Sequence, residues 1–444
     1  MERTSTTSIN LARAGLFGLF AWGVVRAVTQ SVTAGEAWNY NRYIGPEWRE
    51  SLSRFDCNNH VLNTLLVRIS TWRIHLTEFS LRLPSLLFGT LLMVVAYRIA
   101  RRWFGSGAMF LAVLGLLVLN PLVVDAMSEA RGYGMGLAAW MWAFELVTRE
   151  GDGERSKGAL PGVLLGLSVG ASLAFLPPAV ALIIVAVLRR SPSFRYVPHL
   201  AFLTAFVLLV LPVNHAEISV LAEGATSLRQ TLNALTRASF GTGNAILAAL
   251  VRVGFLFLAA AGVAIAVFAA KSSRLVSVSG SALALSLVLL LAANRVAHTA
   301  FPLGGAIYLV PMTTLFIAGA VANWGDESVQ FTFVALAALC VGGYVNQLRL
   351  PYAGAEGVER ARQVAQALRA EAGQSGVSVG ASADAADVMR FYKWRYRQAN
   401  WESIEELRPG AAYSYYVLTA RDAGLLRERG LHVVYEDSGL LLAR

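Results

Sequence analysis

The sequence contains little charge and almost no cysteine. Of its 444 residues, 15% are charged and 56% are hydrophobic, whereas a soluble domain carries about 25% charged residues. The mean hydropathy is +0.53. The two cysteines are Cys57, in a polar segment, and Cys340, in an apolar one, so we expect no disulfide framework. No group of cysteine and histidine residues has the spacing of a zinc site. The chain is therefore neither a soluble globular protein nor a small disulfide-rich one.

Long apolar runs recur along the first three quarters of the chain. Each is close to the 17–25 residues, roughly, that an α-helix needs to cross a hydrocarbon core, whereas a transmembrane β-barrel shows alternating segments of about ten residues. The fold class is therefore a polytopic all-α membrane protein. The first run follows Arg3 and Arg13, so a cleaved signal peptide is an alternative, although its apolar core is normally shorter. We expect about eleven spans, over residues 9–30, 83–100, 107–125, 133–148, 159–175, 177–190, 197–213, 244–270, 278–293, 303–322 and 328–346.

The basic residues indicate membrane lipids rather than nucleic acid as partners. The net charge is +10, but no basic stripe interleaved with aromatic residues is present, and we expect no nucleic acid. Short loops rich in Lys and Arg mark the cytoplasmic side, which assigns "RIARRWFG", "RRSPSFR", "AAKSSR" and the N-terminus to it. The opposite, outer face receives the segment 31–82, "SEARGYG" and the C-terminal tail. We therefore expect a multi-pass protein of the inner or plasma membrane.

Residues 31–82 form a long polar loop rather than a span. Within it, "HVLNTLLVRI" repeats apolar residues with the period of one helical face. Two interpretations stay open: a helix that lies in the membrane interface, or a loop helix packed on the bundle. The apolar residues of this face are Val61, Leu62, Leu65, Leu66 and Ile69.

The tail divides the chain into a transmembrane domain, 1–349, and an extracytoplasmic α/β domain, 350–444. "GVERARQVAQALRAEAG" has helical period, "SYYVLTA" and "LHVVYED" are typical of short strands, and "RDAGLLRERG" predicts a helical piece that ends at Gly430. No glycine-rich phosphate loop is present. Four aromatic residues are interpreted as core rather than as a surface that stacks on sugars: Tyr392, Trp394, Tyr396 and Trp401.

Ionisable residues gather at the ends of spans on the predicted outer face. Charge close to hydrocarbon is costly, so residues that are ordinary helix ends when taken singly indicate a site when they cluster. Arginine suits a lipid phosphate because its planar fork donates two hydrogen bonds and stays charged. A carboxylate can then take a proton from an incoming hydroxyl. The cluster comprises Glu36, Asp56, His60, Asp125, Glu129, Arg131, His215, Glu217, Arg295 and His298.

The order of these motifs resembles a known family. "GEAWNY", "FDCNNHVLNTLLVRIS", "TEFSLRLPSLLFGTLLMVVAYRIARRWFG" and "LNPLVVDAMSEARGYGM" are similar to the C-type-fold membrane glycosyltransferases, the superfamily of protein O-mannosyltransferases and lipid A aminoarabinose transferases. The resemblance covers residues 10–150. It implies a glycosyltransferase that moves a sugar from a polyprenyl-phosphate donor to a lipid, glycan or protein acceptor at the extracytoplasmic face. The family's Asp-Glu pair is Gly35-Glu36 here, and the prolines that follow its second acidic site are missing.

The resemblance also implies roles for the clustered residues. Glu36, or failing that Asp56, is the expected general base, and Arg131 pairs with the donor phosphate and stabilises it as the leaving group. Glu129 orients Arg131, or helps Asp56 and His60 to hold a divalent ion, for which Mg, Mn or Zn are suitable. The other residues expected to bind substrate are Tyr133, Arg295, His298 and Asn59.

Two rival functions fit the same composition. A transporter or flippase for a lipid-linked sugar also binds phosphate among helices, but it tends to place ionisable residues near the midplane and to contain repeated halves. A non-catalytic membrane assembly protein is the third interpretation. The clustering at one face and the lack of repeats favour a transferase.

Three glycines follow the charged cluster, at Gly132, Gly134 and Gly136. They are interpreted as allowing the next span to begin close to the bundle. A phosphate-binding loop is the alternative that we do not favour.

Overall fold

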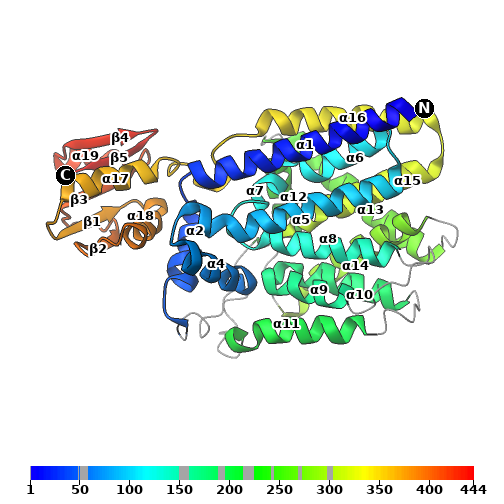
Figure 1. Ribbon diagram of the computed structural model, residues 1–444, viewed down its shortest axis with the longest axis horizontal. Helices are drawn as coiled ribbons and strands as arrows, with labels where there is room; N and C mark the ends of the chain where they lie inside the picture. Colours follow the sequence, from blue (N-terminus) through cyan, green and yellow to red (C-terminus); the bar gives the residue numbers. More distant parts are fainter. Residues whose placement is uncertain are drawn as a thin grey trace.

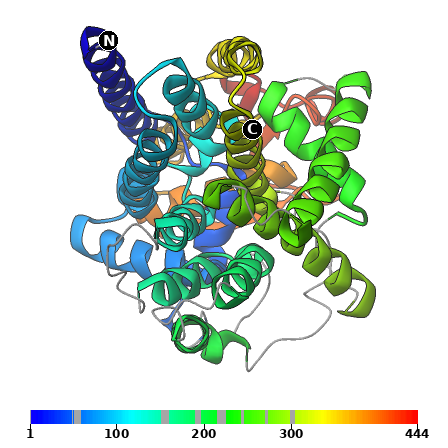
Figure 2. The same cartoon turned by 90° about the vertical axis from the view of Figure 1, so that its right-hand side faces the viewer.

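The protein has two parts that lie at opposite ends of one long axis (Figure 1). The computed structural model describes residues 2–48, 50, 59–149, 160–188, 196–213, 225–241, 245–268, 273–297 and 304–444. A bundle of helices fills one end, with the N-terminus at its far tip, and a small sheet domain fills the other. A view along the axis shows the bundle helices nearly end-on (Figure 2).

Where the structure describes them, the predicted apolar windows fall on helices of the bundle. Five segments are long and apolar enough to cross a membrane alone: Thr6–Thr29, Glu78–Phe104, Arg274–Val296, Gly305–Trp324 and Glu327–Gln347. The multi-pass architecture is confirmed, and the count of about eleven spans stays a prediction because the other apolar helices are shorter. The bundle elements are α1 (Glu2–Thr29), α5 (Glu78–Phe104), α6 (Ala108–Val118), α7 (Pro121–Ala126), α8 (Tyr133–Arg149), α9 (Leu160–Ala171), η2 (Leu173–Phe175), α10 (Leu176–Leu188), α11 (Val197–Val213), α12 (Leu228–Phe240), α13 (Ala245–Phe268), α14 (Arg274–Ala297), η5 (Gly304–Tyr308), α15 (Leu309–Trp324) and α16 (Glu327–Gln347).

The window 107–125 is two helices rather than one. Pro121 begins α7, because a proline without an N–H fits the first turn of a helix but interrupts a continuous one. The side chain of Asn120 caps the new helix and accepts a hydrogen bond from the N–H of Leu122 at 3.0 Å. The chain therefore bends just before the charged turn at residues 127–132.

Close packing explains the glycines at the start of α8. A Cβ on Gly136 would lie 2.6 Å from the ring of Phe175, and one on Gly134 would overlap the carbonyl of Ala126. Gly132 has a φ of +72°, a conformation that glycine adopts without strain. The packing interpretation of the three glycines is confirmed.

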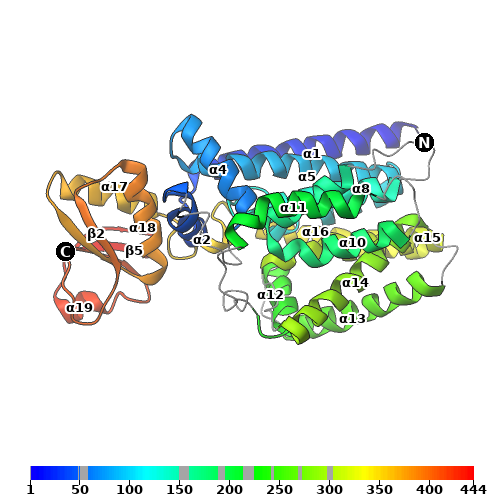
Figure 3. The same ribbon diagram turned by 90° about the horizontal axis from the view of Figure 1, so that it is seen from below.

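Three helices of the polar loop lie between the bundle and the sheet domain: α2 (Ala34–Asn39), η1 (Tyr40–Ile44) and α4 (Val61–Ile74) (Figures 1 and 3). In α4, Val61 and Leu62 are buried, whereas Ile69 and Trp72 are exposed. The first half of α4 is therefore a loop helix packed on the bundle. Its second half has the exposed apolar side chains that an interfacial helix requires.

The sheet domain contains five strands in the order β2-β1-β3-β5-β4. β1 pairs in parallel with β2 and β3, and β5 pairs antiparallel with β3 and β4. The helix predicted within residues 357–373 is confirmed over 361–372, and the two predicted strands and the stop at Gly430 are confirmed. Three strands were not predicted; β5, for example, is a short apolar run that has no strand periodicity. The elements are η6 (Ala353–Ala355), α17 (Ala361–Ala372), β1 (Val377–Ala381), α18 (Ala383–Tyr396), β2 (Trp401–Glu406), β3 (Tyr415–Thr419), α19 (Leu425–Arg429), β4 (Val433–Asp437) and β5 (Leu440–Ala443).

The aromatic residues of the tail divide between core and surface. Tyr392 and Trp401 are fully buried, and Tyr396 is half-buried and stacks on Tyr392 with ring centroids 5.7 Å apart. Trp394, by contrast, is 55% exposed. The core interpretation is confirmed for Tyr392, Tyr396 and Trp401. It is wrong for Trp394, because the side of α18 that carries this residue does not pack on the sheet.

A buried carboxylate joins the sheet domain to the bundle. Glu78, in the first turn of α5, accepts hydrogen bonds from Arg362 Nε at 2.7 Å, from the hydroxyl of Tyr392 at 3.0 Å and from the guanidinium of Arg395. Arg362 also donates to the carbonyl of Val28 at 2.9 Å. Both α17 and α18 are thereby fixed to the end of the bundle at which α5 begins.

The connecting segment after α16 is held by two arginines. The guanidinium carbons of Arg26 and Arg82 lie 4.0 and 4.5 Å from the ring centroid of Tyr352, and the Tyr352 hydroxyl is 3.0 Å from Ser128 Oγ. Asp125, which the sequence placed in the outer cluster, pairs with Arg26 at 2.7 Å and accepts the N–H of Ala353 at 3.1 Å. Asp125 therefore secures the connection between the two domains.

Replacing Glu78 by Gln is expected to loosen the sheet domain. The change leaves Arg362 and Arg395 without their carboxylate, and removing one member of a buried pair costs about 3–5 kcal/mol. Limited proteolysis and hydrogen exchange of residues 348–360 should accelerate markedly. The control is Glu371→Gln, whose partner Arg444 lies 3.6 Å away at the surface and which should cost no more than ~1 kcal/mol. Equal rates in both variants would contradict the role of Glu78.

Candidate functional site

Glu36 is held by four donors at the junction of the two domains. Its Oε1 accepts from Arg82 Nε at 2.8 Å and from the N–H of Ala130 at 2.9 Å. Its Oε2 accepts from Arg82 Nη2 at 2.6 Å and from the N–H of Thr33 at 2.9 Å. The bond from Thr33 belongs to the capping box that begins α2. Both side chains of the Glu36–Arg82 pair are completely enclosed.

This environment makes Glu36 a poor proton acceptor. Burial raises the pKa of the carboxyl, but the charge and hydrogen bonds of Arg82 and the two backbone N–H groups outweigh it, so the pKa is lowered from its ordinary value. Each oxygen already accepts two hydrogen bonds, and neither faces a cavity. The expectation that Glu36 is the general base therefore finds no support in the geometry, and the residue acts as an anchor.

The anchor positions the next charged turn. The peptide of Ala130 is fixed on both sides, because its N–H donates to Glu36 and its carbonyl accepts from Asn63 Nδ2 at 3.1 Å. Arg131 follows directly. The site thus brings together α2 and α4 of the polar loop with the turn after α7, which lies more than 50 residues further along the chain.

A cavity of about 420 Å³ opens beside this turn. Its walls come from α2, from the start of α4, from the charged turn and from the first turns of α18, so the membrane domain and the sheet domain both contribute. Arg131 lines it together with two acidic residues of the sheet domain, Asp384 and Asp387. The lining residues are Ala34, Gly35, Trp38, Asn39, His60, Arg131, Ala383, Asp384 and Asp387.

Arg131 is the cation of this cavity that the sequence predicted. Its guanidinium is 35% exposed and lies over the ring of Tyr133, with Cζ 5.5 Å from the centroid. It lies flat against Gly35, where a Cβ would be 3.1 Å from Cζ. The Gly-Glu sequence in place of the family's Asp-Glu pair therefore makes room for Arg131.

Glu129 is the neighbour of Arg131, with Oε1 4.0 Å from Nη1. It also accepts a hydrogen bond from Thr33 Oγ1 at 3.1 Å. Burial raises the pKa of Glu129, Arg131 lowers it, and the charges of Glu36 and Asp125 raise it again, which places it at about 7. At neutral pH this carboxyl is close to half protonated, the state in which a group exchanges protons most readily.

His60 lines the cavity as a neutral ring. It is 1% exposed, and Nδ1 lies 3.1 Å from the carbonyl oxygen of Ala171, which assigns the proton to Nδ1. Burial and the charge of Arg131 lower its pKa to about 3. The ring packs edge-to-face on Tyr133 at 4.8 Å. Within the described part of the chain, Nε2 has no hydrogen-bond partner.

The predicted metal site is only partly described. Asp56, one of its three ligands, lies outside the described residues. Those residues contain no group of three or more His, Cys, Asp or Glu that fits a metal ion. The free lone pair of His60 Nε2 suits a metal, but the charge of Arg131 beside it opposes a cation. The metal stays a prediction, which elemental analysis of the purified protein tests.

The remaining predicted residues are dispersed. Asn59 is buried and accepts a hydrogen bond from Thr64 at 3.4 Å. Arg295, in the last turn of α14, is exposed and does not line the cavity. His298, His215 and Glu217 lie outside the described residues.

Several residues of the site were missed from the sequence. Arg82 lies within "LRLPS". An arginine at the start of an apolar span predicts an acidic partner, because an unpaired charge next to hydrocarbon is costly. Asp384 and Asp387 gave no signal, since they follow a short strand in a separate domain. Asp387 Oδ1 lies 2.8 Å from Arg390, and Asp384 Oδ2 lies 3.4 Å from Arg421.

The helical bundle, the loop helices and the small sheet domain have the arrangement that the resemblance to the C-type fold predicts. Residues 62–214 match the family model described as dolichyl-phosphate-mannose-protein mannosyltransferase. The resemblance predicted from the motifs is confirmed.

Solved structures extend the likeness to the whole chain. The crystal structure of ArnT from Cupriavidus metallidurans in the apo state has a TM-score of 0.51 and 15% sequence identity. The structure of the same protein bound to undecaprenyl phosphate has a TM-score of 0.55 and 14% identity. Each comparison covers 99% of this chain and 98% of the ArnT chain. No curated protein sequence matches the chain.

The protonation of Glu129 is expected to be visible at neutral pH. The folded protein binds this proton more tightly than the unfolded chain, where the pKa is near 4.5. Stability should therefore fall as the pH rises from about 4.5 to about 7, and change little above. Infrared spectroscopy should show a protonated carboxyl band that disappears with a midpoint near pH 7.

Glu129→Gln should remove both the band and the pH dependence. Glu428→Gln, an exposed acid of α19, serves as the control and should retain them. A midpoint near pH 4.5 would contradict the assignment.

Proposed function

We propose that the protein is a glycosyltransferase that moves a sugar from a polyprenyl-phosphate donor to an acceptor at the extracytoplasmic face of the membrane. The observation that carries the proposal is the partly exposed side chain of Arg131, which lines a cavity between the bundle and the sheet domain. The fold supports it, because ArnT was crystallised with undecaprenyl phosphate.

Arg131 binds the donor phosphate in this proposal. A guanidinium pairs with two phosphate oxygens at once and stays protonated. Gly35 has no side chain that would cover the guanidinium, and the neighbouring carboxylate of Glu129 is 4.0 Å away. That separation is longer than a hydrogen bond, so a phosphate oxygen competes with the carboxylate for the same N–H groups.

Glu129 is a proton donor to the leaving phosphate. With a pKa of about 7, it is partly neutral when the donor binds, and a neutral carboxyl does not repel the phosphate. As the bond between the sugar carbon and the phosphate oxygen breaks, the electron pair passes to that oxygen. Arg131 offsets the new charge, and Glu129 supplies a proton to it.

The base is the second of the two predicted carboxylates, Asp56. Glu36 is saturated with donors, whereas Asp56 precedes Asn59 and His60 by three and four residues, and His60 lines the cavity. The acceptor oxygen attacks the anomeric carbon, its proton passes to Asp56, and the phosphate leaves from the opposite side. The configuration at the sugar carbon is inverted in this single displacement.

Substitutions of Arg131 and Glu129 are expected to have different effects on binding and on catalysis. Arg131→Gln should weaken the binding of undecaprenyl phosphate and lower sugar transfer by about 10²–10³-fold. Glu129→Gln should leave that binding almost unchanged and lower kcat by about 10²-fold or more, with the pH dependence near 7 lost. Transfer of a radiolabelled polyprenyl-phosphate sugar, with binding measured by native mass spectrometry, checks both. Arg427→Gln, at the exposed surface of α19, is the control.

The assignment of the base makes a separate prediction. Asp56→Asn should abolish transfer while the donor still binds, whereas Glu36→Gln should lower the amount of folded protein, because it leaves Arg82 buried without its partner. Purification yield, thermal melting and transfer rate separate the two effects. A stable Asp56→Asn protein with full activity would refute the base. A labelled lipid-linked sugar that crosses proteoliposomes without forming product would replace the transferase by a transporter.

A further inference from the structure

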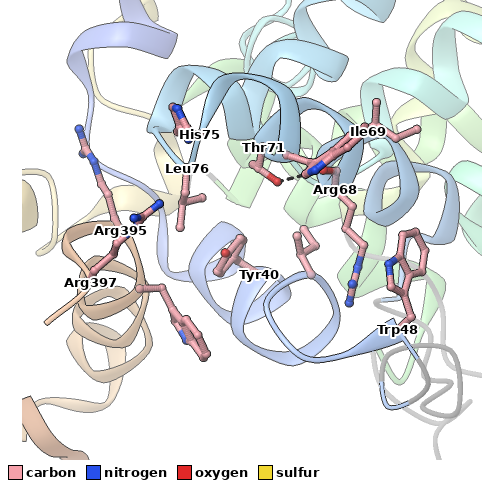
Figure 4. A pocket seen from close by; sticks show the side chains of 12 residues that line it. Tyr40, Trp48, Arg68, Ile69, Thr71, His75, Leu76, Arg395 and Arg397 are labelled. Carbon is pink, nitrogen blue, oxygen red and sulfur yellow. Dashed lines mark hydrogen bonds between the residues drawn. The ribbon is translucent and has the colours of Figure 1, made fainter. Parts of the chain in front are cut away.

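The far end of the bundle carries a basic motif that the proposed function does not use. Two cavities lie at the opposite end, where the bundle meets the sheet domain: that of Arg131, and one of about 680 Å³ between α4 and the end of α18. Figure 4 shows Tyr40 at the centre of the second cavity, between Arg68 and Arg395. The motif "RIARRWFG", residues 98–105, lines neither cavity. It ends α5, which runs from the sheet domain to the tip of the bundle that holds the N-terminus (Figure 1).

Arg98 is oriented by two neighbours on α8. Its Nη2 donates to Glu145 Oε1 at 3.2 Å, and its Cζ lies 5.3 Å from the ring centroid of Trp142. The side chain of Glu145 is 2% exposed, whereas that of Arg98 is 40% exposed. The carboxylate is thus enclosed between the helices, and part of the guanidinium stays on the surface. An arginine that is both paired and stacked is in position before a ligand binds.

Arg101 adds a second positive charge one turn further along α5. Residues three apart lie on the same side of a helix, so Arg98 and Arg101 are neighbours on one surface. Within the described part of the chain, no carboxylate lies in ion-pair range of Arg101. Two other arginines of this end are engaged with the protein itself, since Arg149 lies 3.9 Å from Glu145 and Arg274 donates to a carbonyl of α8 at 3.1 Å. Arg101 is therefore a charge that a ligand can neutralise.

An exposed apolar stripe on α5 leads to these arginines. Leu87, Leu91 and Val94 are 59%, 45% and 45% exposed. With Arg98 and Arg101 they recur at intervals of three and four residues, which is the spacing of one helical face. The helix rises about 16 Å from Leu87 to Arg98, and one leaflet contributes roughly 15 Å of hydrocarbon. An acyl chain of one leaflet therefore covers the stripe when its phosphate lies at the arginines.

The charges at this surface distinguish between classes of lipid. A zwitterionic headgroup carries a cation next to its phosphate, and Arg101 repels that cation. Glu145 does not offset the repulsion, because its carboxylate is enclosed. An anionic headgroup lacks the cation, and a guanidinium pairs with its phosphate oxygens through two parallel hydrogen bonds. The surface is therefore complementary to a phospholipid of net negative charge.

We propose that Arg98 and Arg101, together with the stripe of Leu87, Leu91 and Val94, bind an anionic phospholipid in the leaflet at the far end of the bundle. The arginines recognise the phosphate, and the stripe contacts one acyl chain. The inference requires only that α5 spans the membrane, so it does not depend on the proposed reaction. Because the lipid binds the folded helix surface and not the unfolded chain, it raises the melting temperature.

The test is the binding of dioleoyl-phosphatidylglycerol to the delipidated full chain in detergent, measured by native mass spectrometry. Phosphatidylglycerol should bind at least about tenfold more tightly than dioleoyl-phosphatidylcholine, and it should raise the melting temperature. The double variant Arg98→Gln, Arg101→Gln should lose about tenfold or more of the affinity for phosphatidylglycerol. It should also lose the melting shift, whereas its binding of phosphatidylcholine should not change.

A second variant separates lipid binding from folding. Arg98→Gln removes a partner of the buried Glu145 and can lower stability, whereas Arg101→Gln alone keeps that pair intact. The single variant should lose about fivefold of the affinity for phosphatidylglycerol. The control is Arg229→Gln, Arg237→Gln, which removes two exposed arginines of α12 and should bind phosphatidylglycerol like the original protein.

Equal affinities for the two lipids would overturn the proposal. So would an unchanged affinity in the Arg101→Gln protein, or the same loss in the α12 control as in the double variant. Glycerol 1-phosphate supplies the phosphate without the acyl chains. If it displaced phosphatidylglycerol at equal concentration, the arginines would form a phosphate site and the stripe would have no role in binding.

Discussion

The enclosed pair of Glu36 and Arg82 is the interaction on which the rest of the structure depends. Two charges without water are stable only when each has its full set of partners. Meeting that requirement fixes the start of α2, the charged turn at Ala130 and the top of α5 relative to one another. Arg82 also lies over Tyr352, so the same pair determines where the sheet domain begins.

Much of the fold was predictable because hydrocarbon imposes a simple rule on the sequence: spans are long, apolar and helical. Arg131 and Glu129 could be singled out because several charged residues cluster at the ends of spans, although each of them alone is an ordinary helix end. The structural role of Glu36 could not be predicted, because its carboxylate oxygens accept hydrogen bonds from Arg82, which belongs to another helix. The wall formed by Asp384 and Asp387 depends on how two domains dock, and no local pattern encodes that.

The proposed chemistry depends on balanced electrostatics rather than on one strong acid or base. The pKa of Glu129 is raised above all by burial and lowered by Arg131, and the charges of Glu36 and Asp125 raise it further. Both of those acids are themselves structural anchors. The groups that hold the two domains together therefore also adjust the proton affinity of the site, so its architecture and its reactivity cannot vary independently.

The contacts of Tyr352 restrict the position of the sheet domain. Its ring is enclosed by Arg26 and Arg82, and its hydroxyl by Ser128, which leaves the connection between bundle and sheet domain without slack. A sheet domain on such a joint is held against the end of the bundle. In the proposed function, a lipid-linked donor would therefore enter the cavity from the side, by lateral diffusion in the bilayer.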